Sequence, residues 1–147
     1  MKRGGPLLVT VVAKHHDTRE GLKTYLQGAG VSTTTTGSLE RVVEMTPPSA
    51  TAVILFPDEY ETGAALRALA LLKATRAQTI PVIVTGEPRR FEEPDTDPPQ
   101  RTAPLVLPKP AWAWTMMDAV RARLEFLSTF PGGEPTPKGR DAGRGRA

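Results

Sequence analysis

The feature that most constrains the fold is a regular alternation of short apolar runs with segments of helical character. The apolar runs are rich in aliphatic and β-branched residues and lie at residues 7–12, 31–36, 52–56, 80–85 and 105–107. Helical patterns follow the first three runs, and a last helix is expected over residues 111–127. Strands that alternate with helices form a parallel sheet with right-handed crossovers and helices on both faces. The sequence therefore predicts an α/β fold with a five-stranded parallel sheet.

Local signals set the expected ends of the first elements. Asp17 and Glu20 have the spacing of a capping box, which predicts a helix start, and Gly28 predicts its end. The run 31–36 is rich in threonine and is expected at an edge of the sheet. Ser38 is expected to cap a short helix that follows.

One segment, residues 86–104, breaks the alternation. A further helix is expected there, but the chain has prolines at 88, 94, 98, 99 and 104. Each proline removes a backbone donor and restricts the preceding residue, so no long helix can form. We expect one turn at 87–93 and a loop over the rest. This segment is either a lengthened loop or a surface that changes which partner binds.

The positive charge is concentrated at the C-terminal end. The net charge is +3, and residues 131–147 hold four basic residues against two acidic ones. Apart from proline, this segment has no apolar residue larger than alanine, so we expect a flexible basic tail after a domain over residues 1–130. The body is close to neutral, which does not favour nucleic acid as a partner. The tail is expected to be a solvated end, with weak nucleic-acid contact as the alternative.

Several classes of protein are not expected from this composition. The chain has no cysteine, which excludes disulfides, thiolate metal sites and a cysteine nucleophile. No apolar run approaches the roughly 20 residues of a membrane span, and no secretory signal is evident, so we expect a cytoplasmic protein without a membrane partner. His15 and His16 are expected to be exposed in a loop, because adjacent side chains point apart and no ligand set completes a metal site. We also find no glycine-rich phosphate loop and no Ser/His/Asp arrangement, and therefore expect no enzymatic activity and no cofactor.

The ends of the fourth and fifth runs carry polar side chains that point to a family. Thr85 ends the fourth run and Lys109-Pro110 follows the fifth, 24 residues later. In a parallel sheet, functional groups lie at the carboxyl ends of the strands. Over about residues 6–128 this arrangement resembles the receiver domain of two-component response regulators. Thr85 matches that family's switch hydroxyl, and Lys109 matches its lysine before a commonly cis proline. The resemblance implies a flavodoxin-like (βα)5 sheet with a degenerate fourth helix, and a role in signal transduction or a phosphorelay.

The positions that carry the family's chemistry differ in this sequence. Receivers hold Mg²⁺ with an acidic pair after the first strand and accept a phosphoryl group on an aspartate after the third. The acidic pair corresponds here to Ala13 and Lys14, the acceptor to Phe56, and the aromatic switch position to Val106. Mg²⁺ requires oxygen ligands, which neither a methyl group nor an ammonium group provides. The resemblance is therefore to a degenerate receiver, or pseudo-receiver, without a metal site.

Asp58 leaves an alternative open. It lies two residues beyond Phe56, so a shift in register would place it near the acceptor position. The favoured interpretation is a loop carboxylate that pairs with Lys14 or Lys109, because two lysines in one pocket require a counter-charge. These lysines would keep positive charge where the family binds its metal ion.

Three aromatic residues are candidates for contact with a protein partner: Trp112, Trp114 and Phe91. We expect one tryptophan to pack on the core and the other either to face outward, as an anchor for a partner, or to be partly buried against the proline-rich loop. The predicted function is that of a phosphorylation-independent signalling adaptor that binds protein partners, with a homodimer left open. The alternative is an atypical response regulator that accepts a phosphoryl group on Asp58.

Overall fold

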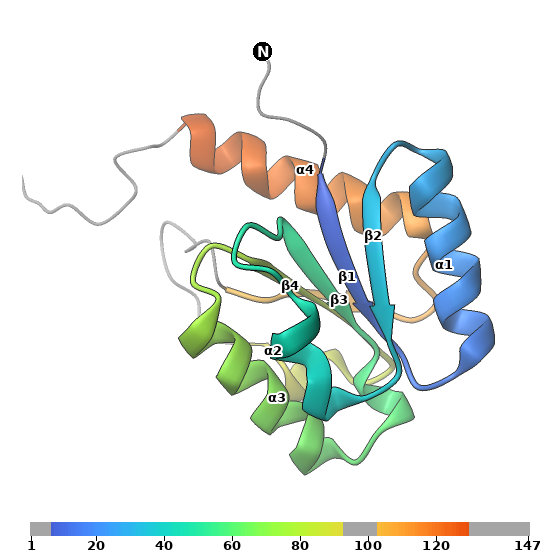
Figure 1. Ribbon diagram of the computed structural model, residues 1–147. Helices are drawn as coiled ribbons and strands as arrows, with labels where there is room; N and C mark the ends of the chain where they lie inside the picture. Colours follow the sequence, from blue (N-terminus) through green and yellow to red (C-terminus); the bar gives the residue numbers. More distant parts are fainter. Residues whose placement is uncertain (1–6, 93–102, 130–147) are drawn as a thin grey trace, which may run out of the picture.

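The computed structural model describes residues 7–92 and 103–129, and the statements below refer to this part of the chain. Its centre is a five-stranded parallel sheet with the strand order β2-β1-β3-β4-β5 (Figure 1). The strands are β1 (Leu8–Val12), β2 (Ser32–Thr36), β3 (Ala52–Leu55), β4 (Ile80–Thr85) and β5 (Leu105–Pro108). The predicted sheet is confirmed, and the threonine-rich β2 lies at an edge as expected.

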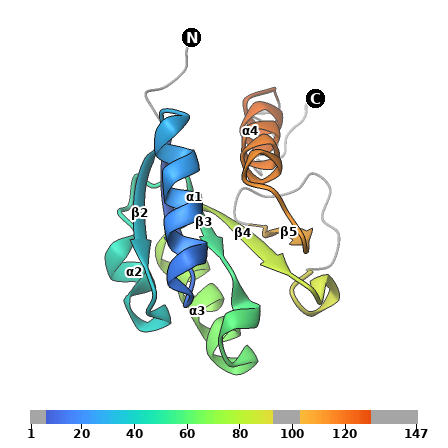
Figure 2. The ribbon, with the colours of Figure 1, turned by 90° about the vertical axis from the view of Figure 1, so that its right-hand side faces the viewer.

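Helices cover both faces of the sheet (Figures 1 and 2). The first face packs against α1 (His16–Gly28) and α4 (Ala113–Thr129), and the second against α2 (Val42–Met45) and α3 (Thr62–Thr75). Short 3-10 turns lie at Leu39–Arg41, Pro57–Glu59 and Pro88–Arg90. No helix in the described ranges has the length and apolar character that a membrane crossing requires.

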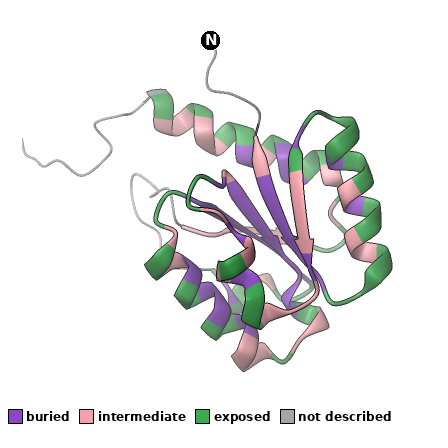
Figure 3. Cartoon of the chain, in the orientation of Figure 1, coloured by how far each residue is buried: buried purple, intermediate pink, exposed green. Residues whose placement is uncertain are grey.

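The alternation of side chains along β3 divides the core into two layers. Ala52 and Ile54 pack in the cluster under α1 and α4, whereas Val53 and Leu55 pack in the cluster under α2 and α3. Successive side chains of a strand point to opposite faces, so a strand covered on both sides must be apolar throughout. Figure 3 shows this burial along the central strands. Phe56 follows the same alternation and packs with the first layer.

The predicted helix caps are wrong in detail. α1 begins at His16, its cap position is His15, and no side chain of the cap residue bonds to the helix, so Asp17 and Glu20 form no capping box. Ser38 likewise makes no cap bond with its side chain. Its backbone N–H donates instead to the Thr36 hydroxyl, at 3.1 Å. The start of α1 is held instead by Glu59, from the loop after β3, whereas the bond at Ser38 is itself local, to a residue two positions earlier.

The proline-rich segment is described only in part. After β4 the chain forms the 3-10 turn Pro88–Arg90, which agrees with the single turn expected at 87–93. Residues 93–102 lie outside the described residues, as do 131–147, so the expectations for the rest of the loop and for the tail stay predictions.

Candidate functional site

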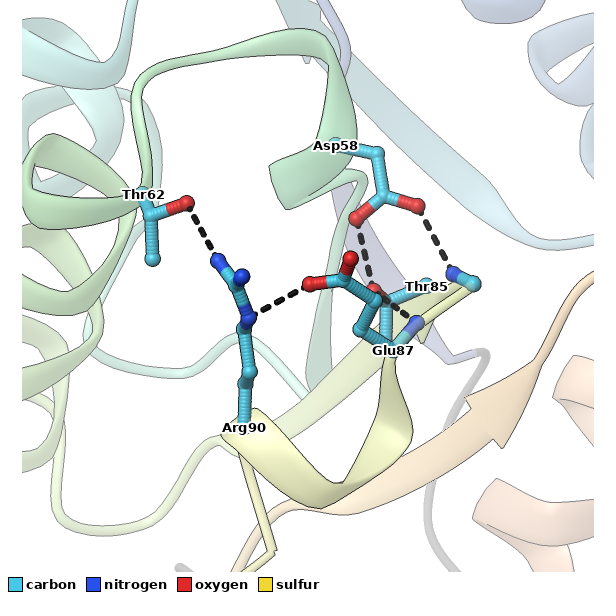
Figure 4. A network of polar contacts seen from close by, with 6 residues as sticks. Asp58, Thr62, Thr85, Glu87 and Arg90 are labelled. Carbon is cyan, nitrogen blue, oxygen red and sulfur yellow. Dashed lines mark hydrogen bonds and ion pairs between the residues drawn. The ribbon is translucent and has the colours of Figure 1, made fainter.

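The carboxylate of Asp58 lies at the carboxyl edge of the sheet, where donors from the end of β4 meet it (Figure 4). The Thr85 hydroxyl donates to its Oδ1 at 2.6 Å, and the Gly86 N–H donates to its Oδ2 at 2.7 Å. The Lys109 Nζ is 3.4 Å from the same Oδ2. Asp58 belongs to the 3-10 turn after β3, which brings its side chain across to β4 and β5. Both carboxylate oxygens therefore have partners within the chain.

Thr85 is fixed from both sides. Its side chain is completely buried, and its hydroxyl donates to Asp58 while accepting the backbone N–H of Glu87 at 3.0 Å. Glu87 forms an ion pair with Arg90, whose guanidinium donates to the Thr62 hydroxyl at 3.1 Å. Figure 4 shows these contacts as one network from the end of β3 to the start of α3. The orientation of the Thr85 hydroxyl is thus set by groups on two different loops.

The pKa of the Asp58 carboxyl lies below its ordinary value. Burial acts in the opposite direction, because it penalises the charged form and so raises this pKa. The Gly86 N–H, the Thr85 hydroxyl and the Lys109 ammonium together outweigh burial, since each of them favours the carboxylate. Asp58 is therefore an anion at neutral pH.

Glu59, the next residue, reaches in a different direction. Its Oε1 accepts the backbone N–H of His15 at 2.9 Å, and its Oε2 accepts the Thr18 hydroxyl at 3.1 Å. A carboxylate at this place satisfies a free backbone donor and interacts favourably with the positive end of the helix dipole. Glu59 thus supplies from the β3 loop the cap that the α1 sequence does not supply itself.

Tyr60 makes a third connection. Its hydroxyl donates to the Gly37 carbonyl oxygen at 2.8 Å, which connects the β3 loop to the turn after β2. Burial raises the pKa of Tyr60 to about 12, the negative charge of Glu59 adds to this effect, and the positive charge of Arg19 opposes it. We call Asp58, Glu59 and Tyr60 the 58–60 clamp, because three consecutive side chains hold three different loops at the carboxyl edge.

Arg19 contacts the backbone of the two residues that follow β1. Its Nη1 donates to the carbonyl oxygens of Ala13 and Lys14, at 2.8 Å each. A Cβ atom on Gly37 would lie 2.6 Å from the same nitrogen, so the guanidinium packs directly against the Gly37 backbone. A fixed positive charge therefore lies against the backbone of Ala13 and Lys14, the two positions that the resemblance to receivers aligns with an acidic pair.

The structure brings some of the predicted pocket residues together and separates others. Asp58, Thr85 and Lys109 are in contact. Ala13 is completely buried in the core, and Phe56 is only 7% exposed and packs among the apolar residues under α1 and α4.

Lys14 differs from the expectation for the pocket. Its side chain is exposed and has no ion pair within the described ranges, so the positive charge at the end of β1 comes from Arg19 instead. His15 and His16 are exposed, and no group of three or more His, Cys, Asp or Glu residues in the described part of the chain could hold a metal ion.

The aromatic candidates also need correction. Phe91 is 5% exposed and packs in the core layer under α2 and α3, so the Phe91 ring offers no surface to a partner. Val106 is partly buried against the same cluster. Trp112 and Trp114 are 59% and 52% exposed and stack on each other, with ring centres 5.2 Å apart and planes 3° from parallel. The expectation that one of them packs on the core is wrong. Trp112 precedes α4, so helical spacing does not separate the two rings.

Sequence reasoning missed Glu59, Tyr60, Gly86 and Arg19. The available signal was a run of polar residues, Asp58 to Tyr60, immediately after a buried strand and a proline. That position predicts a location at the carboxyl edge. It does not predict which loop each side chain reaches.

No protein-family model matches the sequence, and comparison with curated proteins gives no match. Solved structures do match. The response regulator receiver domain protein from Clostridium thermocellum is similar over 84% of this chain and 98% of its own, with a TM-score of 0.64 and 16% identity. The chain has the receiver fold.

Two further structures are similar to this receiver fold. A response regulator receiver protein from Sinorhizobium medicae WSM419 has a TM-score of 0.64 and 15% identity, over 82% of this chain and 95% of its own. The response regulator StyR has a TM-score of 0.63 and 20% identity over 88% of this chain. The match spans 64% of the StyR chain, which is less than two thirds of its length.

Proposed function

We propose that this chain is a phosphorylation-independent signalling adaptor, which uses a receiver fold to bind a protein partner and catalyses no reaction. The observation that carries this proposal is the state of Asp58. Both of its oxygens are bound by Thr85, Gly86 and Lys109, so the chain itself supplies an anion to the donors at this edge.

The residues at the strand ends do not fit a bound Mg²⁺ ion. Such an ion takes oxygen ligands, usually carboxylates. The positions that correspond to the family's acidic pair hold a buried methyl group and an exposed ammonium group, and their carbonyl oxygens accept hydrogen bonds from Arg19. A divalent cation placed here would meet the guanidinium and no acidic pair.

The acceptor position is also unsuited to phosphoryl transfer. The residue that corresponds to the acceptor, Phe56, is a core residue without a nucleophilic atom. Asp58 is ionised, but the donors on its two oxygens reduce their nucleophilicity. The residues at the end of β1 do not fit the divalent ion that would neutralise the charge developed during phosphoryl transfer.

In this proposal Asp58 acts as a fixed internal anion. It holds the Thr85 hydroxyl and the Lys109 ammonium in one arrangement, while Glu59 and Tyr60 hold the neighbouring loops. The surface around the ends of β4 and β5 is then permanently in one conformation. A partner would recognise that surface directly, so signalling would depend on binding and not on a phosphorylation switch.

Incubation with acetyl phosphate and Mg²⁺, followed by intact mass measurement, tests this proposal. We expect no phosphoryl adduct on the full chain, under conditions that label a phosphorylatable receiver treated in parallel. Asp58→Asn is the matched variant, because it keeps the size of the side chain and removes the candidate acceptor. A stoichiometric adduct that disappears in Asp58→Asn would contradict phosphorylation independence.

One observation favours a second candidate function, an atypical phosphoacceptor. Asp58 lies against Thr85 and Lys109, the two residues that match the family, and its side chain is 32% exposed. Under this alternative the adduct forms on Asp58, and Lys109→Ala lowers its yield. The mass measurement separates the two functions directly.

A further inference from the structure

The most exposed aromatic surface in the described residues is the stacked pair of Trp112 and Trp114 at the start of α4. Each of the two residues leaves more than half of its area open to solvent, although the rings stack on each other. Tryptophans that are exposed in this way are common at protein interfaces, where they contribute a large share of the binding energy. This surface takes no part in the contacts around Asp58.

An acidic residue lies beside the pair. Asp118 is four residues after Trp114 on α4, so both side chains lie on the same side of the helix, one turn apart, and both are exposed. Arg121, the next charged residue along this side, forms no ion pair with Asp118 in the described ranges. Lys109, which precedes the pair, is already engaged with Asp58.

We propose that Trp112, Trp114 and Asp118 form a docking site for an arginine-bearing segment of a partner protein. This inference rests on the adaptor function proposed above and names the chemistry of its partner. The face of an indole ring is electron-rich and attracts a cation placed over it. A guanidinium group is planar, so it can stack on an indole and also donate to a carboxylate through its edge. Asp118 provides that carboxylate one turn along the helix.

Other occupants fit these groups less well. An apolar partner, or a second copy that packs tryptophan on tryptophan, would cover the Asp118 carboxylate, which forms no ion pair in the described residues, and burying an unpaired charge is costly. An acidic partner would be repelled by it. A lysine would satisfy the charge, but its ammonium cannot stack on a ring as a planar guanidinium does.

Tryptophan fluorescence tests the proposal on the full chain, because Trp112 and Trp114 are its only tryptophans. The probe is a short peptide in which arginines alternate with glycines, titrated at low salt. We expect a saturable change in emission, with binding at least about threefold weaker for the matching lysine peptide, in line with the loss of stacking. No saturable change with the arginine peptide, or an equal response to a peptide of glutamates, overturns the proposal.

Two variants separate the contributions to this site. Asp118→Asn should weaken arginine-peptide binding about threefold, as expected for the loss of an exposed ion pair. Trp112→Phe should weaken it by a similar factor, because phenylalanine attracts cations less strongly, and it keeps Trp114 as the reporter. Glu40→Gln, an exposed acidic residue before α2 on the opposite face of the sheet, is the control and should bind as the parent does. If Asp118→Asn also binds as the parent does, the site is not the one proposed.

Fluorescence also detects two other occupants of the tryptophan pair, a second copy of the chain and the chain's own arginines. Emission that changes with protein concentration alone, together with dimers in sedimentation, would show a second copy on the pair and overturn the proposal. A variant with glutamine at Arg140, Arg144 and Arg146 tests the chain's own arginines. If its emission differs from that of the parent without any peptide, those arginines occupy the pair, and the assignment to a partner is wrong. None of these results affects the phosphoryl-adduct measurement, so the two proposals fail separately.

Discussion

Replacing Asp58 by asparagine should lower the free energy of unfolding by about 2 kcal/mol near neutral pH. The carboxylate accepts two hydrogen bonds, at 2.6 and 2.7 Å, and bonds to a charged group contribute about 1.5–3 kcal/mol each. The oxygen of an asparagine amide would still accept one of these bonds, now a neutral bond of about 1 kcal/mol. The amide nitrogen would face the other donor and would not accept a hydrogen bond from it. The pair with Lys109 is partly exposed and adds less than about 1 kcal/mol. Since the Asp58 side chain is 32% exposed, water replaces part of the loss, and about 2 kcal/mol remains.

The pH dependence of this difference identifies its cause. The pKa of Asp58 is lowered in the folded protein, so the folded state binds its proton less readily than the unfolded state does. Its contribution is then complete above the unfolded pKa of about 3.9 and is lost as the pH falls through the lower, folded pKa. The difference between the parent and Asp58→Asn should therefore be constant above about pH 5 and shrink below about pH 4.

Urea unfolding measures this difference in the free energy of unfolding. Far-ultraviolet circular dichroism is used to follow unfolding in place of tryptophan fluorescence, because both tryptophans are exposed and report poorly on the core. At this chain length about 2 kcal/mol corresponds to a fall of about 6 °C in Tm, which a thermal melt checks independently. Glu40→Gln is the control for removing an exposed negative charge and should stay within about 0.5 kcal/mol. Equal stability of the parent and Asp58→Asn near neutral pH, or a difference that persists unchanged at about pH 3, would refute the assignment of Asp58 as an ionised internal anion.

Three further predictions concern the clamp and the core. Tyr60 should titrate near pH 12 in an ultraviolet absorbance titration, and Tyr60→Phe should remove this transition. The contribution of Tyr60 to stability is complete below the unfolded pKa of about 10 and is lost as the pH rises through about 12. Glu59→Gln should cost about 1 kcal/mol and speed hydrogen exchange of the first amides of α1; unchanged exchange would mean that the carboxylate does not cap the helix. Phe91→Ala should cost about 3 kcal/mol in urea unfolding, whereas Trp112→Ala should cost less than about 0.5 kcal/mol, and comparable losses would contradict the burial of Phe91.

The parts of the candidate site that could be predicted are those that depend on strand ends. Thr85 and Lys109 follow apolar runs, and parallel strands bring their carboxyl ends to one edge, so their proximity follows from the topology. Phe56 could be assigned to the core by the alternation along β3, which places it in the same layer as Ile54. The exposure of both tryptophans could not be predicted, because it depends on where α4 begins.

The sequence by itself determined the order of strands and helices and the two-layered core. Those features arise from the periodicity of apolar residues, which acts over a few neighbouring positions. Only the tertiary structure decided what the polar residues after β3 do. The bond from Asp58 to Thr85 spans 27 positions and the bond from Glu59 to His15 spans 44, and each depends on the path of one short turn. A local pattern has no means of specifying such contacts, because they form between loops that the sheet brings together only when the whole chain is folded.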